Sequence, residues 1–146
     1  MVQLWIDEIP NRMSKTPLTC QDALTPQVRE GIALFNRGAF FEQHEVLEAA
    51  WMAEPGAVRD LYRGILQIGV GLLHRERGNR QGALNLLQYG IDRLAPFEPE
   101  CMGVDVHALR EAAIRLRAVV EATSAEDLAT VDPALVPQVA IRGEIA

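Results

Sequence analysis

The chain has 146 residues, of which 49% are hydrophobic and 23% are charged, and this size and composition predict one compact domain with a buried core. Twenty acidic residues outnumber 14 basic ones, and the formal net charge of -6 argues against a protein that binds nucleic acid through non-specific phosphate contacts. The longest nearly unbroken apolar run, residues 65–73, is about half of the roughly 20 residues that a membrane-spanning helix needs. We therefore expect neither a nucleic-acid partner nor a membrane span.

The first residues, MVQLWIDEIPNRM, carry acidic side chains where a secretory signal carries basic ones, and they lack an apolar segment of sufficient length. We therefore expect the protein to stay in the cytoplasm. The two cysteines, Cys20 and Cys101, belong to no CxxC motif and no Cys/His cluster. Because disulfides are rare in the cytoplasm, the sequence predicts that both cysteines are reduced and that they form no zinc site.

Apolar residues at helical spacing, separated by short turns rich in glycine and proline, predict a chain built from helices. The predicted helices cover residues 26–36, 40–52, 58–77, 80–94 and 106–122. Thr25, Asn79 and Asp105 each stand just before one of these helices, where a short polar side chain can cap the free backbone N–H groups.

The two ends of the chain, residues 1–24 and 123–146, show no sustained periodicity and are predicted to be irregular arms that lie on a helical domain of residues 25–122. A weak alternation around residues 139–141 leaves open a short strand that pairs with the N-terminal arm. The first four helices form two repeat-like helix-turn-helix pairs. The predicted fold is therefore an all-α, single-domain bundle of about five helices.

The second predicted helix contains the sequence HEVLE, an HExxE motif that begins at His44 and ends at Glu48. On a helical wheel of 100° per residue, both side chains fall inside the arc that contains Phe40, Phe41 and Trp51, which we predict to line the core or a pocket. We therefore expect His44 and Glu48 to be buried, where an unpaired polar group is costly. Removing either one should then cost about 1 to 3 kcal/mol.

The short turn between the second and third helices predicts that they are antiparallel neighbours. Counting outward from this turn places Arg63 and Gln67 of the third helix opposite the HExxE pair. His74 follows on the same stripe, roughly 10 Å further along the helix. The candidate polar cluster comprises His44, Glu48, Glu45 at the edge of the apolar arc, Arg63, Gln67 and His74.

Three interpretations of this cluster are open. The first is a hydrogen-bonded His44–Glu48 pair that fixes the packing of two helices and holds no cofactor. The second is a divalent metal site, because HExxE differs from the zinc motif HExxH only at its last position and His74 would complete a two-histidine, one-carboxylate set. The third is an acid–base site without metal. We favour the packing pair, since counting places His74 away from His44.

The segments FNRGAFFEQHEVLEAAW and RGILQIGVGLLHRERGNRQGALNLL resemble, in order and spacing, the signature of a bacterial and archaeal family catalogued as domain of unknown function 309. The resemblance covers about residues 28–94 and implies a small all-α bundle with no assigned activity. Arg63 stands where members often carry other polar residues. The signature positions are occupied here by Glu42, His44, Glu45, Glu48, Trp51, Gln67, His74, Gly78, Asn79 and Gly82.

Two classes of function are compatible with these patterns. The first is a non-enzymatic helical module that binds a protein partner or self-associates. The second is a small metal-dependent or acid–base hydrolase that uses His44 and Glu48, with or without His74. We favour the first, because the helix pairs are repeat-like and the set of catalytic residues is incomplete.

Overall fold

A computed structural model describes residues 16–143, and helices dominate it. The helices are α2 (Pro26–Asn36), α3 (Phe40–Ala53), α4 (Arg59–Glu76), α5 (Arg80–Leu94) and α6 (Val106–Glu121). The shorter elements are the 3-10 helices η2 (Ala95–Phe97), η3 (Ala125–Thr130) and η4 (Pro133–Leu135), and the strands β1 (Glu100–Cys101) and β2 (Val104–Asp105). The five α-helices begin and end within one residue of the predicted ranges, so the all-α prediction is confirmed.

The helix boundaries follow from local chemistry. The side chains of Thr25, Asn79 and Asp105 each accept a hydrogen bond from the backbone N–H three residues further along, as predicted for N-caps. The turns after α2 and α4 contain Gly38 and Gly78, whose φ angles are 82° and 72°. Residues other than glycine rarely adopt this left-handed backbone conformation, so glycine is the favoured residue at both turns.

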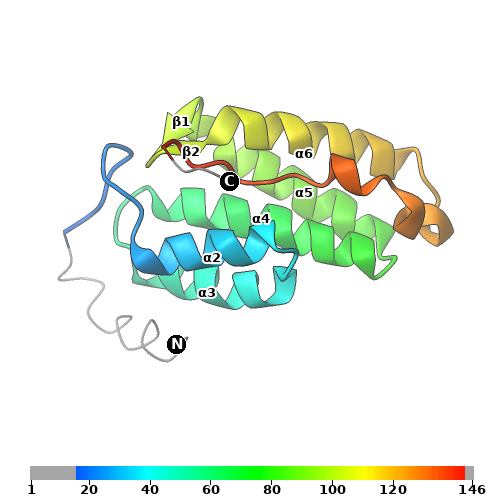
Figure 1. Ribbon diagram of the computed structural model, residues 1–146, viewed down its shortest axis with the longest axis horizontal. Coiled ribbons are helices and arrows are strands. Elements are labelled where there is room, and N and C mark those ends of the chain that lie inside the picture. The colour runs from blue at the N-terminus through cyan, green and yellow to red at the C-terminus, as the bar shows by residue number, and fades with distance from the viewer. Residues whose placement is uncertain (1–15, 144–146) are drawn as a thin grey trace.

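Consecutive helices pack against one another along the bundle (Figure 1). α4 lies in the middle, with α3 and α5 as its main neighbours, while α2 covers α3 and α6 covers α5. Leu47, Leu61, Ile65, Leu87 and Leu116 are fully buried and represent the core that these helices share. None of the helices in residues 16–143 combines the length and the apolarity needed to cross a bilayer.

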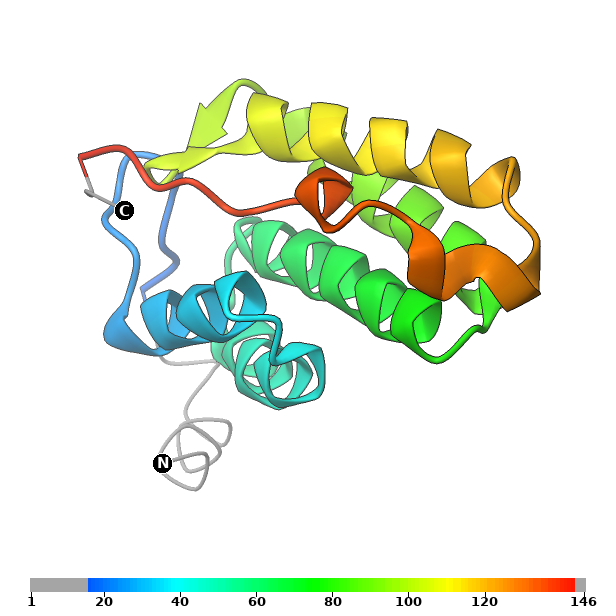
Figure 2. The same cartoon turned by 45° about the vertical axis from the view of Figure 1, so that its right-hand side comes forward.

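The segment that follows α6 runs back across α4 and α6 toward the strands (Figure 2). Leu128, Val131 and Val139 of this segment are buried. The side chain of Asn36 accepts a hydrogen bond from the N–H of Val139 at 2.8 Å and donates one to its carbonyl oxygen at 2.9 Å. Arg75 Nη2 donates to the carbonyl oxygen of Val131 at 3.2 Å. These contacts attach the C-terminal arm to α2 and α4.

The strands differ from the prediction. β1 and β2 form an antiparallel hairpin around Met102 and Gly103, whose φ angles of 53° and 80° are typical of a tight type I′ turn. Ile141 bridges to Val104 of this hairpin. The pairing that the sequence alternation left open involves the N-terminal arm, most of which lies outside the described residues. Strands of two residues are too short to produce a readable alternation, so the sequence pattern could not predict them.

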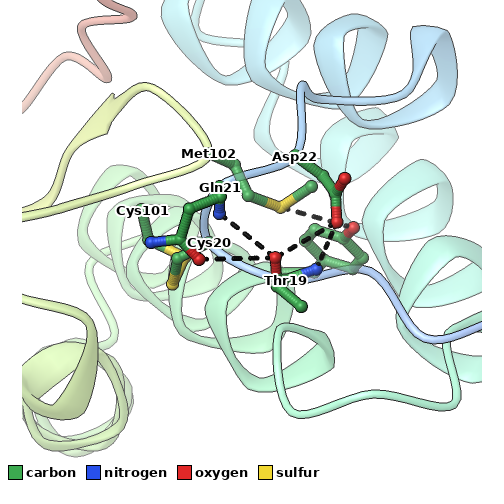
Figure 3. The surroundings of a disulfide bond; sticks show 7 residues. Thr19, Cys20, Gln21, Asp22, Cys101 and Met102 are labelled. Carbon is green, nitrogen blue, oxygen red and sulfur yellow. Dashed lines mark hydrogen bonds between the residues drawn. A yellow bond between two sulfur atoms is a disulfide. The ribbon is translucent and has the colours of Figure 1, made fainter.

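Cys20 and Cys101 form a disulfide, which contradicts the prediction that both are reduced (Figure 3). The bond joins the segment before α2 to β1, and Met102 N donates to the carbonyl oxygen of Cys20 at 2.8 Å. The prediction failed because the two cysteines are 81 residues apart and only the folded chain brings them together. The cytoplasmic location stays a prediction, and a disulfide is less common in that compartment than outside it.

The same N-terminal segment is also held by Glu54, the residue that follows α3. Glu54 Oε2 accepts hydrogen bonds from the N–H groups of Leu18 at 3.0 Å and Gly56 at 2.9 Å. Tyr62 lies below the segment, with its hydroxyl 3.7 Å from Met102 Sδ. Burial, and then the nearby charge of Glu54, raise the pKa of Tyr62 well above its ordinary value, so the phenol stays neutral.

Candidate functional site

The HExxE pair lies at the edge of the buried face of α3. The side chains of His44 and Glu48 are 38% and 46% exposed, so the prediction that both are buried was wrong. The buried residues of α3 are Phe40, Gln43, Val46, Leu47, Ala49, Ala50 and Ala53. Three small alanines lie on this buried face, where they let the backbones of neighbouring helices approach closely. The buried face of α3 therefore differs from the face that its aromatic residues predicted.

The three aromatic residues of α3 therefore have different environments. Phe40 is buried at 4% exposure, as predicted, and its ring packs edge-on against Phe35 of α2. Phe41 is 52% exposed, which contradicts its predicted place in the core or a pocket. Trp51 is half-buried and packs against the edge of the core.

A pocket of about 200 Å³ lies between α3, α4 and α5, and we call it the α3–α5 pocket. It is lined by His44, Glu48, Trp51, Arg63, Leu66, Gln67, Val70 and Leu86. The structure thus places Arg63 and Gln67 on the same pocket as the HExxE pair. Counting outward from the turn between α3 and α4 indicated these neighbours.

The polar groups of the pocket make few direct contacts with one another. His44 Nε2 lies 3.2 Å from Glu48 Oε2, one helical turn away. The guanidinium groups of Arg59 and Arg63 lie 4.5 Å and 4.4 Å from the centroid of the Trp51 ring, within the range of cation–π attraction. The indole Nε1 of Trp51 is buried and has no hydrogen-bond partner within residues 16–143.

Gln67 has a structural partner. Its Oε1 accepts a hydrogen bond from Arg93 Nε at 3.1 Å, and Arg93 Nη1 lies 3.1 Å from Asp60. This chain of contacts joins α4 to α5 along the wall of the pocket. The amide of Gln67 is therefore already used in helix packing.

His74 and Glu45 lie outside the pocket. Asn79 Nδ2 donates to His74 Nδ1 at 3.1 Å, so this histidine supports the residue that caps α5. Glu45 is exposed and does not line the pocket. In the described part of the chain, no three His, Cys, Asp or Glu side chains come close enough together to hold a metal ion.

Known proteins that resemble this chain match the region of the pocket. The family model described as domain of unknown function (DUF309) matches residues 28–86. The resemblance to DUF309 is confirmed. Every residue that lines the α3–α5 pocket falls within this DUF309 match. The family description assigns no activity, so the chemistry of the pocket has to be inferred from its own side chains.

A curated protein is also similar to this chain, but its description adds no function. An uncharacterized protein of Aquifex aeolicus (strain VF5) is 24% identical over 84 residues. The aligned part is 57% of this chain and 25% of the relative, so the chain spans about a quarter of the length of that relative.

Sequence reasoning missed Arg59, which contacts Trp51 beside the pocket, and Leu86, which lines it. Arg59 was overlooked although it precedes Arg63 by one helical turn, a spacing that places both guanidinium groups on one side of α4. Leu86 of α5 was overlooked because nothing in the local sequence shows which side of α5 faces α3. Arg59 could have been found from its spacing, whereas Leu86 could not.

The half-exposed HExxE pair predicts small effects on stability. We expect His44→Ala and Glu48→Ala each to lower the free energy of unfolding by no more than about 0.5 kcal/mol, because exposed i, i+4 pairs contribute little. Gln43→Ala should cost more, since Gln43 is fully buried and donates to the carbonyl oxygen of Leu66 at 3.3 Å. Urea unfolding curves of the three variants test this, and equal losses would contradict the placement of the pair at the edge.

Proposed function

We propose that this protein is a non-enzymatic interaction module that self-associates through the side of the bundle around the α3–α5 pocket. We call this side the α3–α5 face. It comprises the pocket lining together with Phe41, Glu45, Met52, Arg59 and Tyr89. The observation that carries the proposal is the distribution of the large apolar side chains that are exposed in the described part of the chain. Three of these four side chains lie on this face.

The exposed large hydrophobic residues in the described part of the chain are Phe41, Met52, Tyr89 and Ile114. Phe41 and Met52 lie on one stripe of α3, because residues spaced by three, four, seven or eleven positions share a helix face. Tyr89 follows the pocket residue Leu86 by three positions on α5. Single exposed apolar residues are ordinary, but three around one pocket are typical of a contact surface.

The side chains of the face are also those that contribute most to protein association. Trp, Tyr and Arg dominate the residues whose loss weakens interfaces, and Met and Phe are enriched with them. Trp51 is already held against Arg59 and Arg63. Side chains that are ordered before binding lose less conformational entropy when a partner arrives.

The charges on the face support a second copy of the chain as the partner. α3 contributes the carboxylates of Glu45 and Glu48, and α4 contributes the guanidinium groups of Arg59 and Arg63. In a two-fold dimer the same surface of both copies meets. The acidic residues of each copy can then lie opposite the basic residues of the other copy, so this favourable contact forms twice. This self-complementary pattern favours self-association over a partner of one charge.

The hydrolase alternative is supported by less. It uses the His44–Glu48 pair, which is within reach of solvent, but His74 contacts Asn79 instead of this pair. Activity requires further groups that stabilise charge in the transition state. Ester hydrolysis by the purified protein that disappears in His44→Ala would favour the alternative and contradict the interaction proposal.

Sedimentation velocity over a range of concentrations tests the role of the exposed aromatic side chain. We expect Phe41→Ser to weaken self-association at least about tenfold, as expected for the loss of a central apolar contact. Ile114→Ser is the matched control, because Ile114 is also exposed but lies on α6. Equal dissociation constants for Phe41→Ser and wild type would contradict the assigned face.

A further inference from the structure

We propose that the protein binds a small organic anion in a second cavity, where the N-terminal end of α3 meets the C-terminal end of α4 and the C-terminal arm. This cavity measures about 490 Å³ and is separate from the α3–α5 pocket. Its lining includes two arginines, Arg37 and Arg75, together with Phe40 at the start of α3. Neither the family description nor the sequence patterns point to this site.

The main observation is a buried positive charge without a counter-ion. Arg75 is only 9% exposed, and it forms no ion pair within residues 16–143. Its Nη2 donates to the carbonyl oxygen of Val131, while its Nε is buried and has no hydrogen-bond partner among the described residues. Burying a charge is costly unless that charge is paired. An anion in the cavity that Arg75 lines would supply the missing pair.

The start of α3 provides a second, independent group of donors. Its N-cap residue is Ala39, which makes no side-chain cap hydrogen bond. The first N–H groups of a helix have no partners within the helix, and the helix dipole places partial positive charge there. Helix N-termini bind anionic groups for this reason. Because Phe40 lines the cavity, this free helix end borders the space next to Arg75.

The remaining lining residues indicate the kind of anion. Arg37 is exposed and forms no ion pair in the described chain, so it can provide a second guanidinium group for a carboxylate or phosphate head. Phe35, Pro133 and Val136 provide apolar walls. The volume exceeds what an inorganic ion fills. A ligand with an oxyanion head and an apolar body fits this combination.

The lining also contains one carboxylate, so substitutions of two lining residues should change the affinity for an anion in opposite directions. Glu76 lines the cavity and should repel a bound anion. Arg37 should attract it. Both side chains are exposed, so replacing them should leave the fold intact, whereas Arg75 also holds the C-terminal arm through Val131. Arg37→Gln and Glu76→Gln are therefore the informative variants.

Isothermal titration calorimetry at constant ionic strength, with phenyl phosphate and benzoate as probes, tests the site. The probes share an aromatic ring and differ in their oxyanion, so their relative affinities distinguish a phosphate site from a carboxylate site. We expect at least one probe to bind, Arg37→Gln to weaken it about tenfold or more, and Glu76→Gln to strengthen it. Arg77→Gln is the matched control, because Arg77 follows Glu76 at the end of α4 and is exposed but does not line the cavity.

Binding that responds to Arg37 and Glu76 in opposite directions, but not to Arg77, would support the site. Absence of heat with both probes would overturn the proposal. Equal affinities in Arg37→Gln, Arg77→Gln and wild type would overturn it as well, because an anion bound in the cavity would lose affinity when the charge of Arg37 is removed.

Discussion

Replacing Cys20 and Cys101 together with alanine is expected to lower the free energy of unfolding by about 2 to 4 kcal/mol. The disulfide links residues that are 81 positions apart, so it removes many extended conformations from the unfolded chain. It also fixes the segment before α2 on β1, beside the hydrogen bond from Met102 N to the carbonyl oxygen of Cys20. Urea unfolding of the double variant measures the loss.

The wild-type protein in the presence of a reductant is the matched control. Reduction opens the same covalent link without changing any side chain volume. We expect the reduced protein and the double variant to unfold at similar urea concentrations, both below that of the oxidised protein. A wild-type midpoint that does not respond to the reductant, together with an unchanged double variant, would contradict a stabilising disulfide.

Gly90→Val is expected to lower the free energy of unfolding by about 1 to 3 kcal/mol or more. Gly90 lies where α5 crosses α4, and a Cβ atom there would lie 2.9 Å from the carbonyl oxygen of Gly64 and 2.7 Å from Ile68 Cδ1. The side chain of Ile68 can shift, but the backbone oxygen can move only if the two helices separate. Separation would weaken the largest helix–helix contact of the bundle.

Ala118→Val is the control for Gly90→Val, since it adds a branched side chain at an exposed position of α6. Its effect should stay within about 0.5 kcal/mol, as for most surface substitutions. Thermal unfolding of both variants separates the cost of crowding at the helix crossing from the lower helix propensity of valine. Equal losses would indicate that α4 and α5 do not need a glycine at this crossing.

The helices could be predicted because their signals are local. The caps Thr25, Asn79 and Asp105 act on N–H groups three residues away, and the turn glycines act on their own backbone. The Cys20–Cys101 disulfide, in contrast, depends on contacts between distant segments. No local pattern encodes such a contact, so the sequence analysis missed it.

The orientation of α3 shows a second reason why sequence-based prediction failed. The wheel gave most weight to large aromatic residues, whereas the buried face combines Phe40, Val46 and Leu47 with three alanines and Gln43. Leu47 packs against Gly31 of α2, where a Cβ atom would lie 2.4 Å from Leu47 Cδ2. Close contact between helices thus selects small residues, and hydrophobicity alone does not reveal it.

Part of the candidate site could be predicted from the short turn between α3 and α4. Arg63 could be placed near Glu48 because a short turn fixes the register of two antiparallel helices. His74 is too far along α4 for the same register to bring it to the pocket, as the counting indicated. The environment of Arg75 could not be predicted, because the C-terminal arm that covers it has no periodic pattern.

The molar mass in solution of a charge-swapped protein tests the proposed self-association most directly. If two copies meet through the α3–α5 face, Glu48→Arg and Arg63→Glu should each reduce the dimer, because like charges then oppose each other across the two-fold axis. Combining the two substitutions should restore the dimer, while the melting temperatures show that each variant is folded. Light scattering that finds wild type and all three variants equally monomeric at high protein concentration would contradict the account.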